Sequence, residues 1–282
     1  MSTLDQSKCG NFINQRYNAV SEMYPWYYVW SDLYKIFHEV LRFGARDISG
    51  VSLRPICVPQ HIFTRKTDDL QAHFLTGIAI KIHCICKILE GSTDPYIIFS
   101  DADLILNDRD LMEKLKDYEG NDITAMKDLP DSKDYNIGFM LLKNTVEVRT
   151  FFQRVLKKTV EEKKLDQYAF NEEIQTFSGT HGFFDTKYFI QSNMIRKDIW
   201  DMGNYSVIQC LSSEHSSMKD VMLGKLMTIV FFYDIRHLLH WVDRATVSQL
   251  QEDLKAVSPT HYLCSLNLDE IYSATEELPK NA

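Results

Sequence analysis

The segment Tyr96-Ile-Ile-Phe-Ser-Asp-Ala-Asp-Leu-Ile-Leu-Asn107 indicates the fold class of this 282-residue chain. It opens with an uninterrupted apolar run, which is typical of a strand buried on both faces in a sheet that helices cover. Asp101 and Asp103 follow that run directly. In open α/β sheets, ligands bind outside the carboxyl ends of the strands. Because residues i and i+2 of an extended chain point to the same side, we expect both carboxylates to face one ligand.

Strands and helices are predicted to alternate on both sides of this segment. An aromatic and β-branched run predicts a strand over 26–30, and a helix begins after the cap Ser31-Asp32 and ends at Gly44. A helix over 69–90 with an apolar stripe precedes the strand that begins at Tyr96. The other predicted elements are strands over 52–58, 122–126, 137–142 and 183–190, and helices over 146–164, 167–176 and 221–239. This alternation predicts an α/β protein with a mixed, mostly parallel central sheet flanked by helices.

The composition is that of an ordinary globular chain. Hydrophobic residues make up 45% and charged residues 25%, and the formal net charge is −8, so neither a disordered chain nor a nucleic-acid-binding protein is expected. No linker or repeat divides the chain. We predict one domain over 1–282, with a core over about 24–215 and a C-terminal helical extension over about 216–272.

No targeting or membrane segment is recognisable in the sequence. The longest apolar runs fall short of the roughly 18 residues of a membrane span, and the first residues lack the apolar centre of a signal peptide. The six cysteines follow no disulfide-framework spacing. We therefore expect a soluble cytoplasmic protein with free thiols and no membrane span.

The paired acids predict a cation site. Mn²⁺ and Mg²⁺ prefer oxygen ligands and are commonly held by one or two carboxylates together with the phosphates of a substrate. A bare D-x-D also occurs in polar turns, where the acids cap the next element. The buried strand and the helix that precede Asp101 favour the cation site over such a turn.

Two further motifs follow in a fixed order. Asn136-Ile-Gly138 opens an apolar strand, and Leu165-Asp-Gln-Tyr-Ala-Phe-Asn171 opens a helix. The series of an apolar strand with D-x-D, an N-x-G before an apolar strand, and D-Q-x-x-x-N resembles the nucleotide-diphospho-sugar transferase family, whose members are glycosyltransferases of the GT-A fold. The resemblance covers residues 82–190 and implies that fold here.

The resemblance implies a role for each matching residue in donor binding. Asp101 would contact the ribose of the nucleotide and the metal, and Asp103 would bind the metal directly. Asn136 and Gly138 would line the donor-sugar pocket, where glycine allows a close backbone approach. Their alternative role is a turn before a strand.

The resemblance also implies two catalytic residues. Asp166 would act as a general base toward an acceptor hydroxyl or hold the hydroxyl groups of the donor, and Gln167 would stabilise charge on the anomeric side. Their alternative role is structural, with Asp166 as a helix N-cap and Gln167 in solvent.

Other candidates come from the family pattern of a C-terminal histidine and lysines. His215 would be a third metal ligand, and Lys219, with Lys225 further along, would meet the diphosphate; the fuller histidine-glycine-lysine motif is absent. His181 is a second histidine candidate. Relatives sometimes place a basic residue near the nucleotide on the helix before the catalytic strand, but for Lys81 we favour a surface lysine whose stem covers apolar surface.

The predicted function is a metal-dependent glycosyltransferase. It would use Mn²⁺ or Mg²⁺ and move a sugar from a nucleotide-sugar donor, a UDP-sugar in particular, to a hydroxyl of a glycan or glycoprotein acceptor. Many relatives are anchored in the Golgi, so the Golgi lumen is the alternative location if an anchor has been removed. The alternative functions are a haloacid-dehalogenase-like phosphatase, in which Asp101 would be the nucleophile, and a non-catalytic protein that binds nucleotide sugars.

Overall fold

A computed structural model provides the fold. It describes residues 24–31, 35–58, 70–129, 131–192, 205–211, 218–270 and 272. In this part of the chain, the strands form a six-stranded sheet in the order β2-β1-β3-β6-β5-β7 and a three-stranded sheet in the order β4-β9-β8. The strands are β1 (Tyr24–Ser31), β2 (Val51–Val58), β3 (Tyr96–Ser100), β4 (Leu104–Leu106), β5 (Ile123–Lys127), β6 (Tyr135–Lys143), β7 (His181–Phe183), β8 (Phe189–Gln191) and β9 (Val207–Gln209).

The large sheet is mixed, and three of its five pairings are parallel. β3 lies inside it, pairing parallel with β1 and antiparallel with β6. Ile97 and Phe99 on β3 pack into one cluster of buried side chains, and Ile98 packs into another on the opposite face. Because both faces of β3 are covered, an unbroken apolar run suits it better than an alternating one. The predicted buried strand and the mixed, mostly parallel sheet are confirmed.

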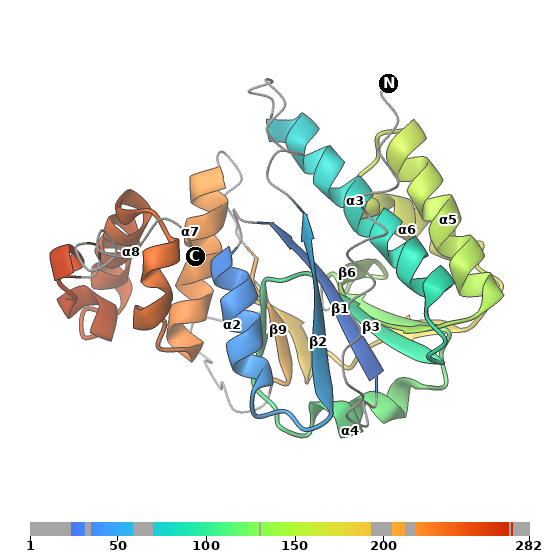
Figure 1. The fold of residues 1–282 in the computed structure, drawn as a ribbon, viewed down its shortest axis with the longest axis horizontal. Coiled ribbons are helices and arrows are strands. Elements are labelled where there is room, and N and C mark those ends of the chain that lie inside the picture. Colours follow the sequence, from blue (N-terminus) through green and yellow to red (C-terminus); the bar gives the residue numbers. More distant parts are fainter. Residues whose placement is uncertain are drawn as a thin grey trace.

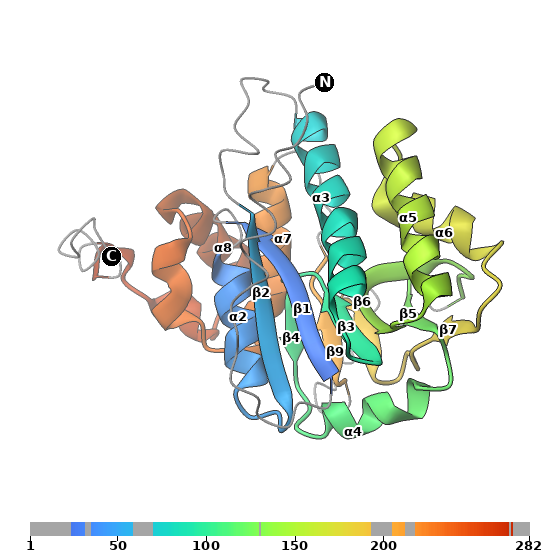
Figure 2. The ribbon, with the colours of Figure 1, turned by 45° about the vertical axis from the view of Figure 1, so that its right-hand side comes forward.

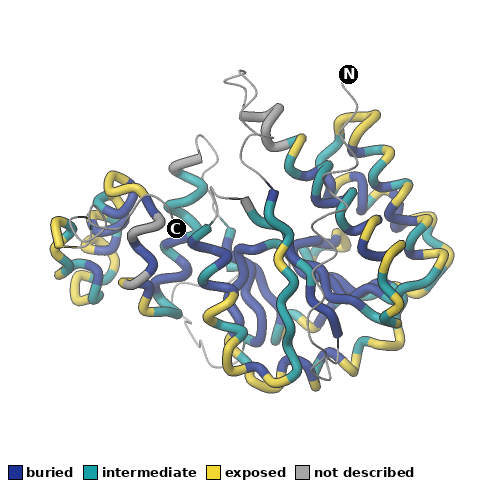
Figure 3. The backbone as a smooth tube through the Cα atoms, viewed as in Figure 1, coloured by how far each residue is buried: buried dark blue, intermediate teal, exposed yellow. Residues whose placement is uncertain are grey.

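Helices cover both faces of the large sheet (Figures 1 and 2). On one face lie α3 (Leu70–Gly91), α5 (Val146–Glu161) and α6 (Asp166–Ile174), and on the other lie α2 (Lys35–Ala45), α7 (Met218–Phe232) and α8 (Arg244–Val257). The remaining helical segments are the short α4 (Leu111–Leu115) and the 3-10 turns at Lys116–Tyr118, Arg236–Trp241 and Tyr262–Ser265. The buried residues lie mainly along the strands, and the exposed residues lie on the outer helices and loops (Figure 3).

Most of the predicted helices and strands occur at the residues where the hydrophobic pattern of the sequence predicts them. The helix predicted over 69–90 is α3, and the strand predicted over 52–58 is β2, which lies at the edge of the sheet. An edge strand tolerates Pro55, because a missing N–H there costs no ladder hydrogen bond to a second neighbour. α5 starts at a cap in which Thr145 accepts a hydrogen bond from the Val148 N–H.

Three expectations are wrong in detail. The strand predicted over 183–190 is two short strands in different sheets, β7 and β8, separated by a turn in which the Tyr188 N–H donates to the Asp185 carbonyl. Gly44 does not end α2, which continues to Ala45; a Cβ at Gly44 would lie 2.6 Å from the Tyr233 hydroxyl, so the glycine permits a close contact. The helix predicted over 221–239 is α7, which ends at Phe232. A separate 3-10 turn follows over Arg236–Trp241.

The C-terminal part of the chain is helical from Met218 onward in the described residues. The predicted boundary near residue 216 and the cap residue Asp32 lie outside the described residues, so the division into core and extension stays a prediction. The five cysteines within the described ranges form no disulfide with one another. No helix in the described ranges is long and apolar enough to cross a membrane.

Candidate active site

The D-x-D segment connects the two sheets. β3 ends at Ser100 and β4 begins at Leu104, so Asp101 and Asp103 lie in the connection. The Asp101 N–H donates to the Gly138 carbonyl at 2.8 Å, and the Cys210 N–H donates to the Asp103 carbonyl at 2.8 Å. Both ends of the segment are therefore held by backbone hydrogen bonds to neighbouring strands.

The Asp101 carboxylate has a partner at each oxygen. Its Oδ1 lies 2.8 Å from the Lys81 Nζ, and its Oδ2 accepts a hydrogen bond of 3.3 Å from Gln209. Burial raises the pKa of Asp101 to about 6, against the opposing effect of the Lys81 charge and with the support of the neighbouring Asp103 and Asp166 charges.

Lys81 joins the D-x-D segment to the Asp166-Gln167 motif. Its Nζ lies 3.2 Å from the Asp166 Oδ2 as well as beside Asp101, and its side chain is only 11% exposed. Burial alone would lower the pKa of Lys81, but the two carboxylates more than offset it and hold that pKa above its usual range. The expectation of a surface lysine is therefore wrong. A signal was present, because Lys81 follows Ile78 by three residues and so shares the buried stripe of α3.

Asp103 pairs with a different lysine from a different helix. Its Oδ2 contacts the Nζ of Lys225 on α7, and the two side chains are only 9% and 15% exposed. The other oxygen of Asp103, Oδ1, is buried and accepts no hydrogen bond from the described residues. A buried carboxylate oxygen without a partner costs free energy, which makes this oxygen a candidate ligand for a cation.

Asn136 and Gly138 shape the start of β6 beside the D-x-D segment. The Asn136 Oδ1 accepts a hydrogen bond of 2.7 Å from the Gly138 N–H. A Cβ at Gly138 would lie 2.1 Å from the Nε2 of Gln209 on β9, so the missing side chain leaves room for Gln209 to reach Asp101. Sequence reasoning missed Gln209, because nothing in its local sequence marks a buried amide that faces another sheet.

Asp166 and Gln167 form the first turn of α6. Leu165 is the residue at the N-cap, so Asp166 is not the cap. Gln167 is not free in solvent, because its amide donates to the Asp128 Oδ1 at 2.9 Å. Asn171, the last residue of this motif, accepts from the Tyr135 N–H at 2.7 Å and donates to the Tyr135 carbonyl at 2.8 Å. The motif therefore fastens α6 to the first residue of β6.

Three of the remaining candidates give no further ligand in the described residues. His215 lies outside them, and Lys219 is in the first turn of α7, where its backbone alone is described. His181 begins β7 and contacts the Tyr135 hydroxyl at 2.6 Å. Within the described ranges, no group of three or more His, Cys, Asp or Glu side chains is arranged to hold a metal ion.

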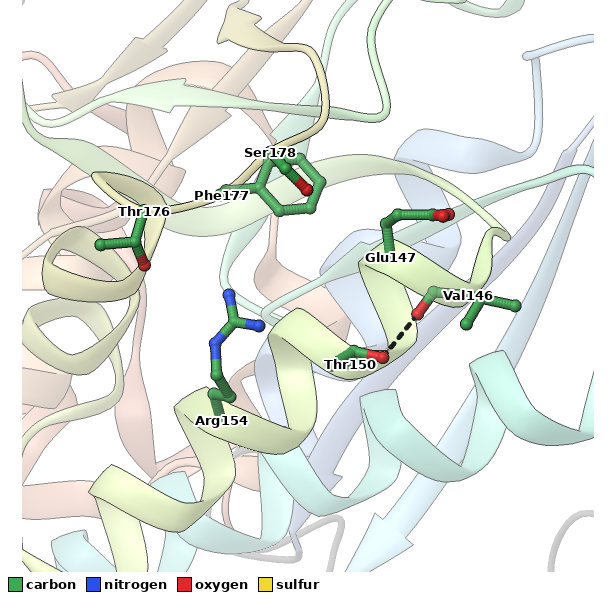
Figure 4. A pocket seen from close by; sticks show the side chains of 7 residues that line it. All are labelled: Val146, Glu147, Thr150, Arg154, Thr176, Phe177 and Ser178. Atoms are coloured by element: carbon green, nitrogen blue, oxygen red, sulfur yellow. Dashed lines mark hydrogen bonds between the residues drawn. The ribbon is translucent and has the colours of Figure 1, made fainter.

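Of two surface pockets, one includes residues of the Asp166-Gln167 motif's helix and the other does not. One of about 340 Å³ contains Gln167 and Asn171 together with exposed residues of α6 such as Tyr168. The other, of about 240 Å³, lies between α5 and the segment after α6, and it contains none of the predicted site residues (Figure 4). Its Arg154 already pairs with Glu173 at 2.7 Å.

Comparison with known proteins identifies the family. Residues 71–214, slightly more than half of the chain, match the sequence profile of the nucleotide-diphospho-sugar transferase family. The chain belongs to this family and is a glycosyltransferase with a nucleotide-sugar donor. The matched residues contain the D-x-D segment, the N-x-G motif and Asp166-Gln167. No curated protein matches the sequence.

Several solved structures are similar to parts of the chain. A glycosyltransferase involved in the glycosylation of the major capsid of PBCV-1 has 9% identity and a TM-score of 0.47, covering 67% of this chain and 96% of that one. The glycosyltransferase GlyE of Streptococcus pneumoniae has 15% identity and a TM-score of 0.46, covering 68% and 55%. Mouse xyloside xylosyltransferase 1 has 12% identity and a TM-score of 0.41, covering 66% and 97%. The mixed, mostly parallel sheet flanked by helices, in a chain of the nucleotide-diphospho-sugar transferase family, is the GT-A fold that the sequence predicts.

Proposed function

We propose that this glycosyltransferase depends on a divalent metal and moves a sugar from a UDP-sugar to a hydroxyl of a glycan or glycoprotein. The observation that carries the proposal is the buried ammonium of Lys81, which contacts both Asp101 and Asp166. Burying the charges of Lys81 and Asp166 beside the partly exposed Asp101 costs free energy that apolar side chains would not. Such clusters with perturbed pKa values concentrate at functional sites, which favours a shared role for the D-x-D and Asp166-Gln167 motifs.

The proposed metal site consists of Asp101 and Asp103. The Oδ1 of Asp103 supports it, because this buried oxygen accepts no hydrogen bond from the described residues and Mn²⁺ or Mg²⁺ would give it a partner. The metal, when bound, would neutralise the charge that develops on the diphosphate leaving group. We keep His215 as the proposed third ligand and Lys219 as a proposed contact of the diphosphate.

The proposed catalytic residues are Asp166 and Gln167. Asp166 is buried, and Lys81 restrains its carboxylate, so this side chain is held in one orientation. We assign to it the role of general base toward the acceptor hydroxyl or of a hydrogen-bond acceptor for the donor hydroxyls. Gln167 would place an amide dipole near the anomeric carbon. Positioned groups of this kind lower the barrier mainly by orientation and electrostatic stabilisation.

Asn136 and Gly138 are the proposed contacts of the donor sugar. Asn136 is buried, and its Oδ1 is occupied by the Gly138 N–H, which leaves its amide nitrogen as the group that would face the sugar. Gly138 lies directly beside Asp101, whose N–H donates to its carbonyl. The two residues therefore border the proposed donor site from β6.

The match to a transferase family favours this function over the phosphatase alternative. A non-catalytic binding protein would need neither a restrained Asp166 nor the contact between the two motifs.

Hydrolysis of a panel of nucleotide sugars tests the proposal. We expect turnover of at least one UDP-sugar with Mn²⁺, a loss of this turnover after chelation with EDTA, and its return when Mn²⁺ is added back. Turnover that survives chelation would refute the metal dependence. A preference for GDP-sugars would refute the UDP assignment, and no turnover of any donor would refute the proposed activity.

A further inference from the structure

Gln209 on β9 is a buried amide that uses only one of its two polar atoms among the described residues. The residue is 4% exposed, and its Nε2 donates to the Asp101 Oδ2 at 3.3 Å. Its Oε1 is also buried and accepts no hydrogen bond from the described residues. A buried carbonyl oxygen in this state lowers the stability of the fold, so its presence points to a ligand that would give it a partner.

Asp101 fixes the orientation of this amide. A carboxylate only accepts hydrogen bonds, so the amide turns its nitrogen toward Asp101 and its oxygen away. Gly138 lies against the same amide, because a Cβ there would be 2.1 Å from the Nε2 and 2.5 Å from the Oε1. Metal sites commonly orient their ligands through a hydrogen bond to the other end of the ligating side chain. The Oε1 of Gln209 is oriented in this way.

The Oδ1 of Asp103 is a second buried oxygen of this kind. Among the described side chains, the buried oxygens that accept no hydrogen bond are this Oδ1 and the Oε1 of Gln209. The two residues belong to neighbouring positions of paired strands, because Leu104 is in register with Gln209 and the Cys210 N–H donates to the Asp103 carbonyl at 2.8 Å. Two such oxygens at one strand pairing, beside Asp101, favour one shared ligand.

The chemistry of the two oxygens indicates the kind of ligand. A hydroxyl group carries one hydrogen, so a single hydroxyl could satisfy one of the two oxygens and not both. Mn²⁺ and Mg²⁺ bind carboxylate oxygens and the amide oxygens of Asn and Gln at the same time. A divalent cation therefore suits the pair better than a substrate hydroxyl does.

We propose that the Oε1 of Gln209 is a direct ligand of the divalent cation at Asp101 and Asp103. This inference rests on the proposed function, because it assumes that the two acids bind a metal. A neutral amide adds a ligand without adding negative charge, so it leaves more of the cation's charge for an anionic substrate. His215 remains a proposed ligand from outside the described residues, since octahedral coordination has room for both side chains.

The test is the affinity of the whole chain for Mn²⁺ alone at pH 8, from the electron paramagnetic resonance signal of free Mn²⁺. Gln209→Met keeps the length of the side chain but has no oxygen, so it should bind Mn²⁺ about tenfold more weakly than the wild type. Gln209→Glu keeps an oxygen and adds a negative charge, so it should bind Mn²⁺ at least as tightly as the wild type. Gln249→Met is the control, because Gln249 lies exposed on α8, and its affinity should equal that of the wild type.

Gln209→Glu distinguishes a metal ligand from a residue that only supports Asp101. Both substitutions remove the hydrogen bond to Asp101, and the new carboxylate would also repel the Asp101 charge. If Gln209 only supported Asp101, both variants would bind Mn²⁺ more weakly than the wild type, and Gln209→Glu would bind it most weakly. A metal ligand predicts the opposite order of the two variants.

Wild-type affinity for Mn²⁺ in Gln209→Met, or weaker binding by Gln209→Glu than by the wild type, would overturn the inference and leave the proposed function intact. A wild type that binds no Mn²⁺, with or without UDP, would refute the proposed metal dependence together with the inference. Circular dichroism checks that each variant folds. If Gln209→Met does not fold, Gln209→Leu replaces it, with the same loss of affinity expected.

Discussion

Asp101 and Asp103 are two residues apart, but the molecule holds them in different ways. Asp101 belongs to a group of three charges in which Lys81 on α3 also contacts Asp166, and each of its oxygens has a partner. In the described part of the chain, Asp103 pairs with Lys225 on α7, and its other, buried oxygen accepts no hydrogen bond. Asp101 is therefore held from α3, which covers one face of the large sheet, and Asp103 is held from α7 in the C-terminal part of the chain.

This difference separates two tasks that a donor site must perform. A carboxylate with both oxygens engaged keeps one orientation and suits the positioning of a substrate. A carboxylate with one oxygen that accepts no hydrogen bond from the described residues suits the capture of a cation. Substitution of Asp103 should therefore mainly affect cation-dependent turnover, and removal of the Lys81 charge beside Asp101 should mainly affect stability.

The largest effect is expected for Asp103→Asn. The amide keeps the shape but loses the charge, so turnover with Mn²⁺ should fall by about 10³-fold, comparable to the loss of a group that stabilises developing charge. The Lys225 ammonium would also lose its contact with the Asp103 charge, which should lower the free energy of unfolding by about 3 kcal/mol. Initial rates and urea denaturation measure the two effects. Asp47→Asn is the control, because Asp47 is an exposed acid on the surface; equal losses in both variants would contradict the assignment.

Lys81→Met tests the other side of the comparison. It leaves the buried Asp166 and the partly exposed Asp101 without their shared cation, so the free energy of unfolding at pH 7 should fall by about 3 kcal/mol. Turnover should fall about 10²-fold, because the two motifs lose their relative orientation. Lys87→Met is the matched control on the same helix, where the lysine is exposed and pairs with Glu90; its stability should change by less than about 0.5 kcal/mol. A similar small change for Lys81→Met would show that the cluster is not structural.

Gly138→Ala probes the amide that supports Asp101. The added Cβ must displace Gln209 and with it the hydrogen bond to Asp101, which should cost about 1–3 kcal/mol of stability. Gly120→Ala serves as the control, because no heavy atom lies within 4 Å of a Cβ at Gly120. In the double variant with Gln209→Ala, the cost of the new methyl group should largely disappear. Thermal denaturation of the wild type, Gly138→Ala, Gly120→Ala and the double variant, with Gln209→Ala as the reference for the double variant, measures these costs. If the methyl group costs as much stability in the double variant as in Gly138→Ala, the clash with Gln209 is not the cause.

A smaller, pH-dependent effect is expected for Asp101 in the metal-free protein. Burial raises its pKa from 3.8 to about 6, so between these values the folded protein holds a proton that the unfolded chain has released. This contribution stabilises the fold below pH 4 and is lost as the pH rises through 6. Relative to the wild type, Asp101→Asn should gain about 2 kcal/mol between pH 4 and pH 6.5, a value reduced for the partial exposure of the side chain. A stability difference that is constant across this range, measured by urea denaturation, would contradict the raised pKa.

The fold could be predicted where an element is long enough to show a period. The stripe on α3 and the apolar run of β3 are of this kind, and both were predicted. β4 and β9 have three residues each, too few for any pattern to distinguish a strand from a loop. The apolar run over 183–190 looks like one strand, but the chain leaves one sheet at Phe183 and enters the other at Phe189, a choice that depends on which edges are free.

The candidate site could be predicted only as far as motifs extend. Asp101, Asp103 and Asp166 stand in motifs with a fixed order. Gln209 carries no motif, and Lys81 and Lys225 were noted without the partners that the structure gives them. A lysine becomes part of a site through the helix packing that brings it to a carboxylate, and no spacing within its own segment encodes that approach.

The central claim is that Asp101 and Asp103 form a cation-dependent donor site. Its most direct test is the rate of hydrolysis of the preferred nucleotide sugar while Mn²⁺ is titrated into EDTA-treated wild-type protein and, in parallel, into Asp103→Asn. We predict a saturable rise from a negligible rate for the wild type and almost no rise for the variant. Full wild-type turnover without Mn²⁺, or an equal rise in both proteins, would contradict the claim.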